Sequence, residues 1–221
     1  IGYPHLNVKI GATHAGITVG EDGATHQCLE DIALMRTIPG MTVINPADAV
    51  EARAAVKAAI LQKGPMYLRF GRLAVPVIYD KDSYRFEIGK GVVMTEGCDV
   101  ALVATGIMVN MALEAAKVLE ERGIHARVIN IHTIKPIDRE LLLRAAGECG
   151  AIVTAEEHNV IGGLGSAVAE VVSEACPVPV IRLGTEDRFG HSGKVPPLLE
   201  MYGLTVQSFV AKAELAVSLK K

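Results

Sequence analysis

Two histidines, two acidic residues and three glycines lie together in one short stretch near the start of the sequence, THAGITVGEDGATHQ at residues 13–27. His14 and His26 stand near its two ends, and Asp22 lies between them. An imidazole can donate, accept or carry a proton near neutral pH. These side chains could therefore hold a polyhydroxylated or phosphorylated substrate and move its protons, but the same composition also suits an exposed polar turn.

Arg69 and Arg72, in the stretch YLRFGRL, are the next candidates for substrate binding. An arginine just past the end of a strand can bind a phosphate group through two parallel N–H groups. We expect Arg69 to pair with a helix carboxylate at the surface, which leaves Arg72 as the better candidate. The spacing of His14 and His26 lacks the short register of zinc sites, so we predict no metal site.

Two other polar motifs have simpler interpretations. EEHNVIGGLGSAV, residues 156–168, has Gly-Gly-x-Gly before a helical pattern and could bind phosphate at the helix N-terminus. Because the spacing of the dinucleotide fingerprint is absent, we favour a tight turn into a helix. We interpret DRFGHSGK as a polar loop with a role at an interface; its functional side chains are Arg188, His191, Ser192 and Lys194.

The elements that must position these residues follow an α/β order. Runs rich in Val, Ile, Leu and Ala are typical of parallel strands covered by helices, and they alternate with stretches of helical spacing. Asp48 stands near one helix start, and Gly123 and Gly150 stand where helices commonly end. We predict strands at 7–13, 41–46, 65–72, 91–96, 98–106, 125–131, 151–157 and 178–184, and helices at 28–38, 47–63, 108–123, 138–150 and 165–176 and in the tail.

This order predicts two α/β domains, at residues 1–75 and 91–221, with a linker at 76–90. The second has enough elements for a complete, open and mostly parallel sheet. The first has too few strands and helices to cover both faces of a parallel sheet. We therefore expect another chain, or a segment preceding Ile1, to complete it, and an unpaired strand edge that favours a homodimer.

Composition limits the class of partner. The formal net charge is −3, and the basic residues are scattered, so we expect no nucleic-acid binding. The apolar runs are too short to span a bilayer and no leader opens the chain, so we expect a cytoplasmic protein without a membrane segment. The four cysteines form no paired motif, and we expect reduced thiols that serve as small core residues.

The quoted loop, followed by LMRTIPGMTVINPADAVEA, resembles the pyrimidine-binding domain of thiamine-diphosphate-dependent transketolases. Residues 91–221 resemble the transketolase C-terminal domain, through the order of their elements and the stretch VTAEEHNVIGGLGSAVAE. The chain as a whole is similar to the C-terminal component of a two-subunit transketolase. The matching loop positions are His14, Gly20, Glu21, Asp22, Gly23, Thr25, His26 and Gln27.

The resemblance implies a role for each candidate residue. His26 would handle hydroxyl protons of the donor sugar at the reaction centre, and Asp22 would bind a substrate hydroxyl beside the bond that breaks. His14 and Arg72 would bind the substrate phosphate, which fits a phosphosugar better than a neutral sugar. The family's Ser-Arg-Gln-Asn after the strand reads Phe-Gly-Arg-Leu here, and the alignment of Arg72 depends on that stretch.

The family's anchors for the cofactor are not in this sequence. They are a glutamate and an aromatic pocket for the pyrimidine, and a Gly-Asp-Gly…Asn motif for the diphosphate and Mg²⁺. We therefore expect the full enzyme to use thiamine diphosphate and Mg²⁺, the fragment to bind neither and to be inactive alone, and an N-terminal subunit or segment to supply the anchors.

Two alternatives remain open. One is a 1-deoxyxylulose-5-phosphate synthase or a 2-oxoacid dehydrogenase β component, which belong to the same superfamily. The synthases have an arginine in place of His14 and a shorter loop, so they fit less well, and the dehydrogenase subunits fit less well again. The other alternative is a non-catalytic dimerisation or scaffold fragment whose loop residues are remnants.

Overall fold

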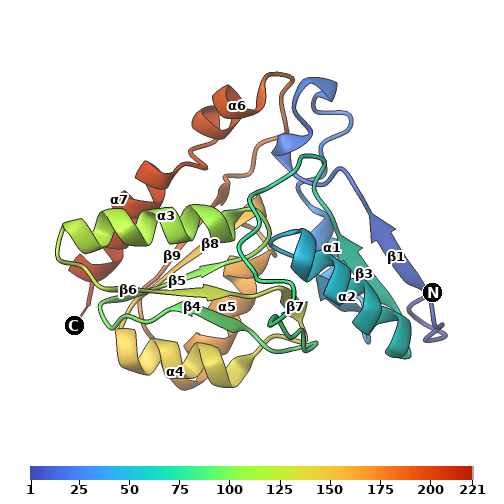
Figure 1. Cartoon of the computed structure of the whole chain (residues 1–221), viewed down its shortest axis with the longest axis horizontal. Helices are drawn as coiled ribbons and strands as arrows, with labels where there is room; N and C mark the ends of the chain where they lie inside the picture. Colours follow the sequence, from blue (N-terminus) through green and yellow to red (C-terminus); the bar gives the residue numbers. More distant parts are fainter. Residues whose placement is uncertain (221) are drawn as a thin grey trace.

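The computed structural model describes residues 1–220, which form two β-sheets with helices packed against them (Figure 1). The N-terminal sheet has the strand order β1-β3-β2-β7. Its first three strands in the sequence are parallel neighbours, with β3 between β1 and β2. They are β1 (Lys9–Ala12), β2 (Thr42–Ile44) and β3 (Met66–Arg69).

The fourth strand of this sheet comes from the C-terminal half of the chain. It is β7 (Thr133–Lys135), which runs antiparallel to β2. The sequence predicts a single strand at 125–131 and does not indicate this exchange, because a three-residue strand is too short to show a period. The sheet that carries the candidate loop therefore depends on a strand from the other half of the molecule.

The C-terminal sheet has the order β4-β6-β5-β8-β9. Strands β5, β6, β8 and β9 run parallel, and β4 pairs antiparallel with β6 at one edge. This confirms the predicted open and mostly parallel α/β architecture. The strands are β4 (Val92–Thr95), β5 (Val100–Ala104), β6 (Ala126–Asn130), β8 (Ile152–Asn159) and β9 (Val180–Thr185).

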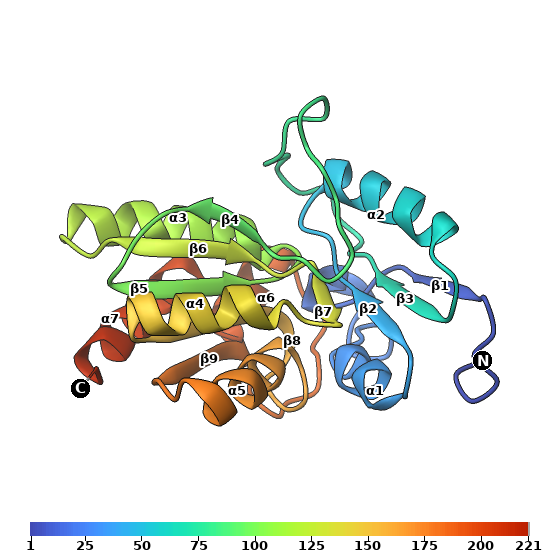
Figure 2. The ribbon, with the colours of Figure 1, turned by 90° about the horizontal axis from the view of Figure 1, so that it is seen from below.

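Helices cover both faces of the C-terminal sheet. Figure 2 shows α3 on one side of this sheet and α4 and α5 on the other, and α7 packs against α3. Helix α2 covers one face of the N-terminal sheet, where alanines of α2 pack against Ile44, Met66 and Leu68. The helices are α1 (Asp31–Thr37), α2 (Ala49–Leu61), α3 (Met108–Glu121), α4 (Arg139–Cys149), α5 (Leu164–Ala175), α6 (Val195–Met201) and α7 (Val206–Ser218).

Local signals fix where several helices begin and end. The side chain of Asp48 accepts the N–H of Glu51 at 2.8 Å and caps α2, as the sequence predicts. Gly123 and Gly150 have positive φ angles of 76° and 70° just after α3 and α4, also as predicted. Capping residues and glycines therefore mark the ends of these helices in the sequence.

The hydrophobic core runs through both halves of the molecule. On β5, Leu102 faces the side of α3 and α7, whereas Val103 faces the side of α4 and α5. The second of these cores also contains Val43 and Tyr67 of the N-terminal sheet. The two sheets thus share a hydrophobic core.

Residues 76–90 form neither helix nor strand, yet they are held in place. The second carboxylate oxygen of Asp48 accepts the N–H groups of Ile78 and Tyr79 at 2.8 and 3.0 Å. Buried Glu51 accepts hydrogen bonds from the hydroxyl of Tyr84 and from the amide of Asn130. The start of α2 therefore fastens this segment to the body of the protein.

All four cysteines are free, but the prediction that they serve as core residues is only partly correct. Cys149 is buried at the end of α4, and burial raises the pKa of its thiol. Cys98 is exposed, because it lies in the turn between β4 and β5. The sequence gives no signal that separates these two environments.

Candidate active site

The candidate loop leaves the carboxyl end of β1 and forms a 3-10 helix, η1 (Ile17–Asp22), before it reaches α1. Open parallel sheets place ligands at this end of their strands. The N–H of Ala15 donates to the carbonyl oxygen of Phe70 at 3.1 Å, so the loop runs beside the chain that leaves β3. This brings the loop next to the segment that holds Arg72.

Arg72 and Asp22 are brought together by this arrangement. Nη1 of Arg72 donates to the carbonyl oxygen of Val19 at 2.7 Å, and its Nε lies 3.9 Å from Oδ2 of Asp22. The two side chains are 37% and 41% exposed, so both can reach a bound ligand. Two of the four predicted substrate-site residues therefore form one cation–carboxylate pair at the end of the sheet.

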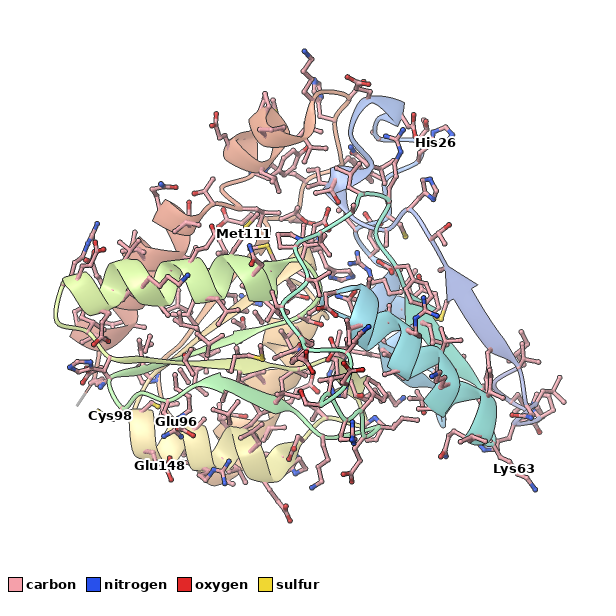
Figure 3. The ribbon with its side chains drawn as sticks, in the orientation of Figure 1. His26, Lys63, Glu96, Cys98, Met111 and Glu148 are labelled. Carbon is pink, nitrogen blue, oxygen red and sulfur yellow. The ribbon has the colours of Figure 1, made fainter. Side chains whose placement is uncertain are left out.

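His14 and His26 are both exposed, and each is held by its neighbour in the sequence. Nδ1 of His14 lies 3.0 Å from the hydroxyl of Thr13, and Nδ1 of His26 lies 3.0 Å from the hydroxyl of Thr25. Both contacts leave Nε2 free for a ligand. His14 has a φ of 63°, a left-handed conformation that is uncommon outside glycine. Figure 3 shows His26 at the outer edge of the loop, directed away from the sheets.

Arg69 pairs with a helix carboxylate as predicted, but the prediction that this happens at the surface is wrong. Its Nε donates to Oδ2 of Asp31 in α1 at 2.8 Å, and both side chains are buried. Burial raises the pKa of Asp31, but the charge and hydrogen bond of Arg69 outweigh this effect and leave the pKa below its ordinary value. Arg69 is therefore a structural group beneath the site.

The Gly-Gly-x-Gly stretch is a turn into α5, and a side chain of this protein already occupies the N-terminus of α5. The carboxylate of Glu156 accepts the N–H groups of Leu164 and Gly165 at 2.6 and 2.8 Å. A Cβ on Gly163 would overlap this carboxylate. The turn therefore holds a carboxyl group of the protein itself and leaves no space for a phosphate.

The DRFGHSGK stretch forms a loop that packs against the candidate loop. The side-chain amide of Gln27 donates to the carbonyl oxygen of His191 at 2.9 Å, and the hydroxyl of Ser192 donates to that of Glu21 at 2.7 Å. A Cβ on Gly23 would come within 3.1 Å of the Ser192 side chain. This contact joins the C-terminal half of the chain to the candidate loop. It is a contact within one chain.

An apolar cavity of about 560 Å³ lies beside the loop, between the start of α2, the segment after β3, and helices α3 and α6. Thr18, Phe70, Met111 and Leu199 are among its lining residues. Met111 lies near the loop-facing end of α3 (Figure 3). None of His14, Asp22, His26 and Arg72 lines this cavity, so the polar site and the apolar cavity are separate features.

The described residues offer no metal centre. Within residues 1–220 no three His, Cys, Asp or Glu side chains are grouped so that they could hold a metal ion. The same part of the chain has no helix that is long and apolar enough to cross a membrane. The carboxyl group of Glu156 also occupies the N-terminus of α5, so this turn offers no place for a diphosphate.

Family models match almost the whole chain. Residues 2–77 match the transketolase pyrimidine binding domain, and residues 89–208 match the transketolase C-terminal domain. The chain belongs to the transketolase family.

Individual relatives align along nearly the whole of this chain. A putative transketolase C-terminal section from Methanocaldococcus jannaschii is 46% identical over 96% of this chain and 67% of its own length. A 6-deoxy-6-sulfo-D-fructose transketolase subunit from a Clostridium species is also 46% identical, over 96% of this chain and 66% of its own length. A 1-deoxy-D-xylulose-5-phosphate synthase from Geobacter sulfurreducens is 42% identical over 95% of this chain and 33% of its own.

One solved structure supports the same assignment. A split gene transketolase, described as an inactive beta4 tetramer, has a TM-score of 0.94 and 55% sequence identity with this chain. The match covers 100% of this chain and 70% of the chain in that structure. The transketolase resemblance and the α/β fold are thereby confirmed. This chain spans about two thirds of the length of the first curated relatives that it matches.

Two buried carboxylates that were not among the predicted residues, Asp31 and Glu157, support the loop from below. Asp31 binds Arg69, and Glu157 binds the backbone of η1 at Thr18. One signal was present for Glu157, because two adjacent acids end a stretch, AIVTAEE, that otherwise has the pattern of a buried strand. Buried carboxylates need a partner, and that need points to a contact outside the strand.

Proposed function

We propose that this chain is the substrate-side part of a transketolase, which transfers a two-carbon ketol unit between phosphosugars. The pairing of Arg72 with Asp22 beside the exposed histidines of the loop carries this proposal. It joins a cation suited to a phosphate, a carboxylate suited to a sugar hydroxyl, and imidazoles suited to proton transfer. These groups share one end of the parallel sheet, where α/β proteins bind substrates.

Each residue has a distinct task in this proposal. Arg72 and His14 bind the substrate phosphate, and Asp22 accepts a hydrogen bond from a hydroxyl next to the bond that breaks. His26 takes and returns hydroxyl protons of the donor sugar through Nε2, since Nδ1 already faces the hydroxyl of Thr25. Arg72 is held on the carbonyl oxygen of Val19, which leaves its remaining N–H groups for phosphate.

Thiamine diphosphate and Mg²⁺ belong to the full enzyme in this proposal, and the cofactor supplies carbanion stabilisation. Another polypeptide or segment must hold them, because the donor groups of this chain suit neither the diphosphate nor the metal. The name of the solved relative, an inactive tetramer of one subunit type, supports inactivity of this chain alone. We include a homodimer in the proposal, because β1 is an edge strand.

A second candidate function comes from the related synthases. A 1-deoxyxylulose-5-phosphate synthase or a 2-oxoacid dehydrogenase β component would take a 2-oxoacid as donor instead of a ketose phosphate. The pairing of Arg72 with Asp22 and the presence of His14 favour the ketose donor. A scaffold fragment, in contrast, would require none of the loop side chains.

A reconstitution assay tests the proposal. The purified chain is mixed with thiamine diphosphate, Mg²⁺ and an N-terminal transketolase subunit that carries the cofactor anchors, and ketol transfer is measured with a ketose phosphate donor and an aldose phosphate acceptor. We expect transfer in the mixture and none from either part alone. Transfer from a 2-oxoacid donor only would favour the second function, and a mixture that forms a complex without transfer would favour the scaffold.

A further inference from the structure

Glu157 lies in β8 of the C-terminal sheet, far in sequence from the candidate loop, and is 4% exposed. Its Oε1 accepts the backbone N–H of Thr18 in η1 at 2.5 Å. Burial raises the pKa of Glu157, and the charge of Arg69 and the hydrogen bonds from Thr18 and Ile17 oppose this rise. A buried carboxylate of one domain therefore forms its main polar contact with the substrate loop of the other.

Gly16 makes room for this contact. It has a φ of 86°, and a Cβ at this position would overlap the carboxylate of Glu157. An L-residue would be strained there even without the overlap. The loop therefore bends around the Glu157 carboxylate and is shaped to receive it.

Arg69 joins the backbone of Glu157 to the base of the loop. Its Nη2 donates to the carbonyl oxygens of Glu157 and Cys28 at 2.9 and 3.2 Å. The Cys28 carbonyl also accepts the N–H of Gly16 at 2.9 Å and so closes the loop at its two ends. Arg69 keeps its own pair with Asp31, so the loss of the Glu157 charge leaves no unpaired guanidinium.

We infer that Glu157 is a positioning residue of the substrate loop, which holds η1 so that Asp22 and Arg72 meet at the end of the sheet. The contact at Thr18 adjoins Val19, whose carbonyl oxygen holds Arg72. The same short helix ends at Asp22. The buried carboxylate of Glu157 thereby fixes the backbone of η1, and this backbone positions Asp22 and Arg72.

Amide hydrogen exchange of the chain itself tests the positioning role. Glu157→Gln keeps the size of the side chain but removes its charge and replaces one acceptor oxygen by an NH2 donor, and Glu157→Asp keeps the charge but shortens the reach. We expect roughly tenfold faster exchange of amides 16–22 in both variants, with unchanged exchange in α4. Glu51→Gln is the matched control, because Glu51 is also a buried glutamate but binds the 76–90 segment and Asn130.

Each outcome decides the inference. Loop exchange within twofold of wild type in both variants would overturn it, as would equal acceleration throughout the chain or acceleration of the loop in Glu51→Gln. If one variant fails to fold, the other still reports on the loop.

The kinetic test rests on the proposed function. In the reconstituted enzyme, Glu157→Gln should raise KM for a phosphosugar more than KM for the matching free sugar, because it disturbs the backbone that holds Arg72, the proposed phosphate ligand. An equal change in KM for both sugars, or no change for either, would contradict positioning. If the wild-type mixture shows no transfer, the proposed function fails while the exchange result still stands.

Discussion

The carboxylate of Asp22 and the guanidinium of Arg72 lie 3.9 Å apart, joined across two segments that leave neighbouring strands of the same sheet. Both groups are more than one third exposed, and exposed pairs of this kind contribute about 0–1 kcal/mol to stability. The pair is therefore weak enough to open. A substrate that offers a phosphate to Arg72 and a hydroxyl to Asp22 could replace it at little cost.

The first prediction follows from this weak pair. In the reconstituted enzyme, Arg72→Ala should raise KM for a phosphosugar roughly 10–100-fold, since a charge-assisted hydrogen bond contributes about 1.5–3 kcal/mol. Steady-state kinetics with a phosphosugar and with the matching free sugar would measure the effect. Arg53→Ala, at an exposed arginine of α2, is the control and should leave both substrates unchanged. Equal losses on both sugars would show that Arg72 is structural.

The second prediction concerns the ion pair beneath the loop. Asp31→Ala removes the partner of Arg69 and leaves a buried charge, so we expect a loss of about 3–5 kcal/mol in the free energy of unfolding. Chemical denaturation of the chain measures it. Glu170→Ala removes the partner of Arg36, where the carboxylate is 63% exposed, and should cost about 1 kcal/mol or less. Similar losses from both variants would contradict the difference in burial.

The sequence predicts the regular parts of this fold well because their signals are local. Asp48 caps α2, and Gly150 ends α4 through contacts within a few residues. The loop residues could be chosen by their chemistry, and Arg72 and Asp22 do meet.

Other features depend on partners far away in the sequence. The exchange of β7 into the N-terminal sheet, the hydrogen bond of Arg69 to the carbonyl oxygen of Glu157 and the contact between Glu157 and Thr18 all join the two halves of the chain. No local period or spacing encodes such contacts. Their only trace in the sequence is a polar residue inside an apolar pattern, which signals a partner but does not identify it.

The third prediction is a pH dependence of stability that comes from Glu156. Burial raises its pKa to about 7, although the N–H groups of Gly165 and Leu164 oppose the rise. Between its ordinary value of 4.5 and about 7, the folded state keeps a proton that the unfolded state has lost. The stability that depends on this proton is therefore lost as pH rises through that window, and the loss is complete above pH 7.

Glu156→Gln removes this dependence. The free energy of unfolding of the variant minus that of wild type should increase by a few kcal/mol from pH 5 to pH 8. Denaturation at several pH values gives this difference. Glu174→Gln, at a side chain that is 68% exposed on α5, is the control and should track wild type. A difference that stays constant with pH would show that the hydrogen bonds at α5 keep Glu156 ionised throughout.

The last prediction concerns proton transfer by His26. The imidazole is exposed, its Nδ1 faces the hydroxyl of Thr25 at 3.0 Å, and its Nε2 is left for substrate. General acid–base catalysis commonly contributes ~10²–10⁴-fold in rate, so His26→Ala should lower kcat by such a factor in the reconstituted enzyme while KM changes little. The loss should be equal on phosphorylated and free sugars, because the proton is transferred at the reaction centre and not at the phosphate. This pattern is opposite to the one expected for Arg72→Ala.

His125→Ala is the matched control, since His125 is also exposed but binds Glu120 beside the turn between β4 and β5. Normal turnover in His26→Ala would remove His26 from the chemistry and would make its end of the loop a polar surface turn.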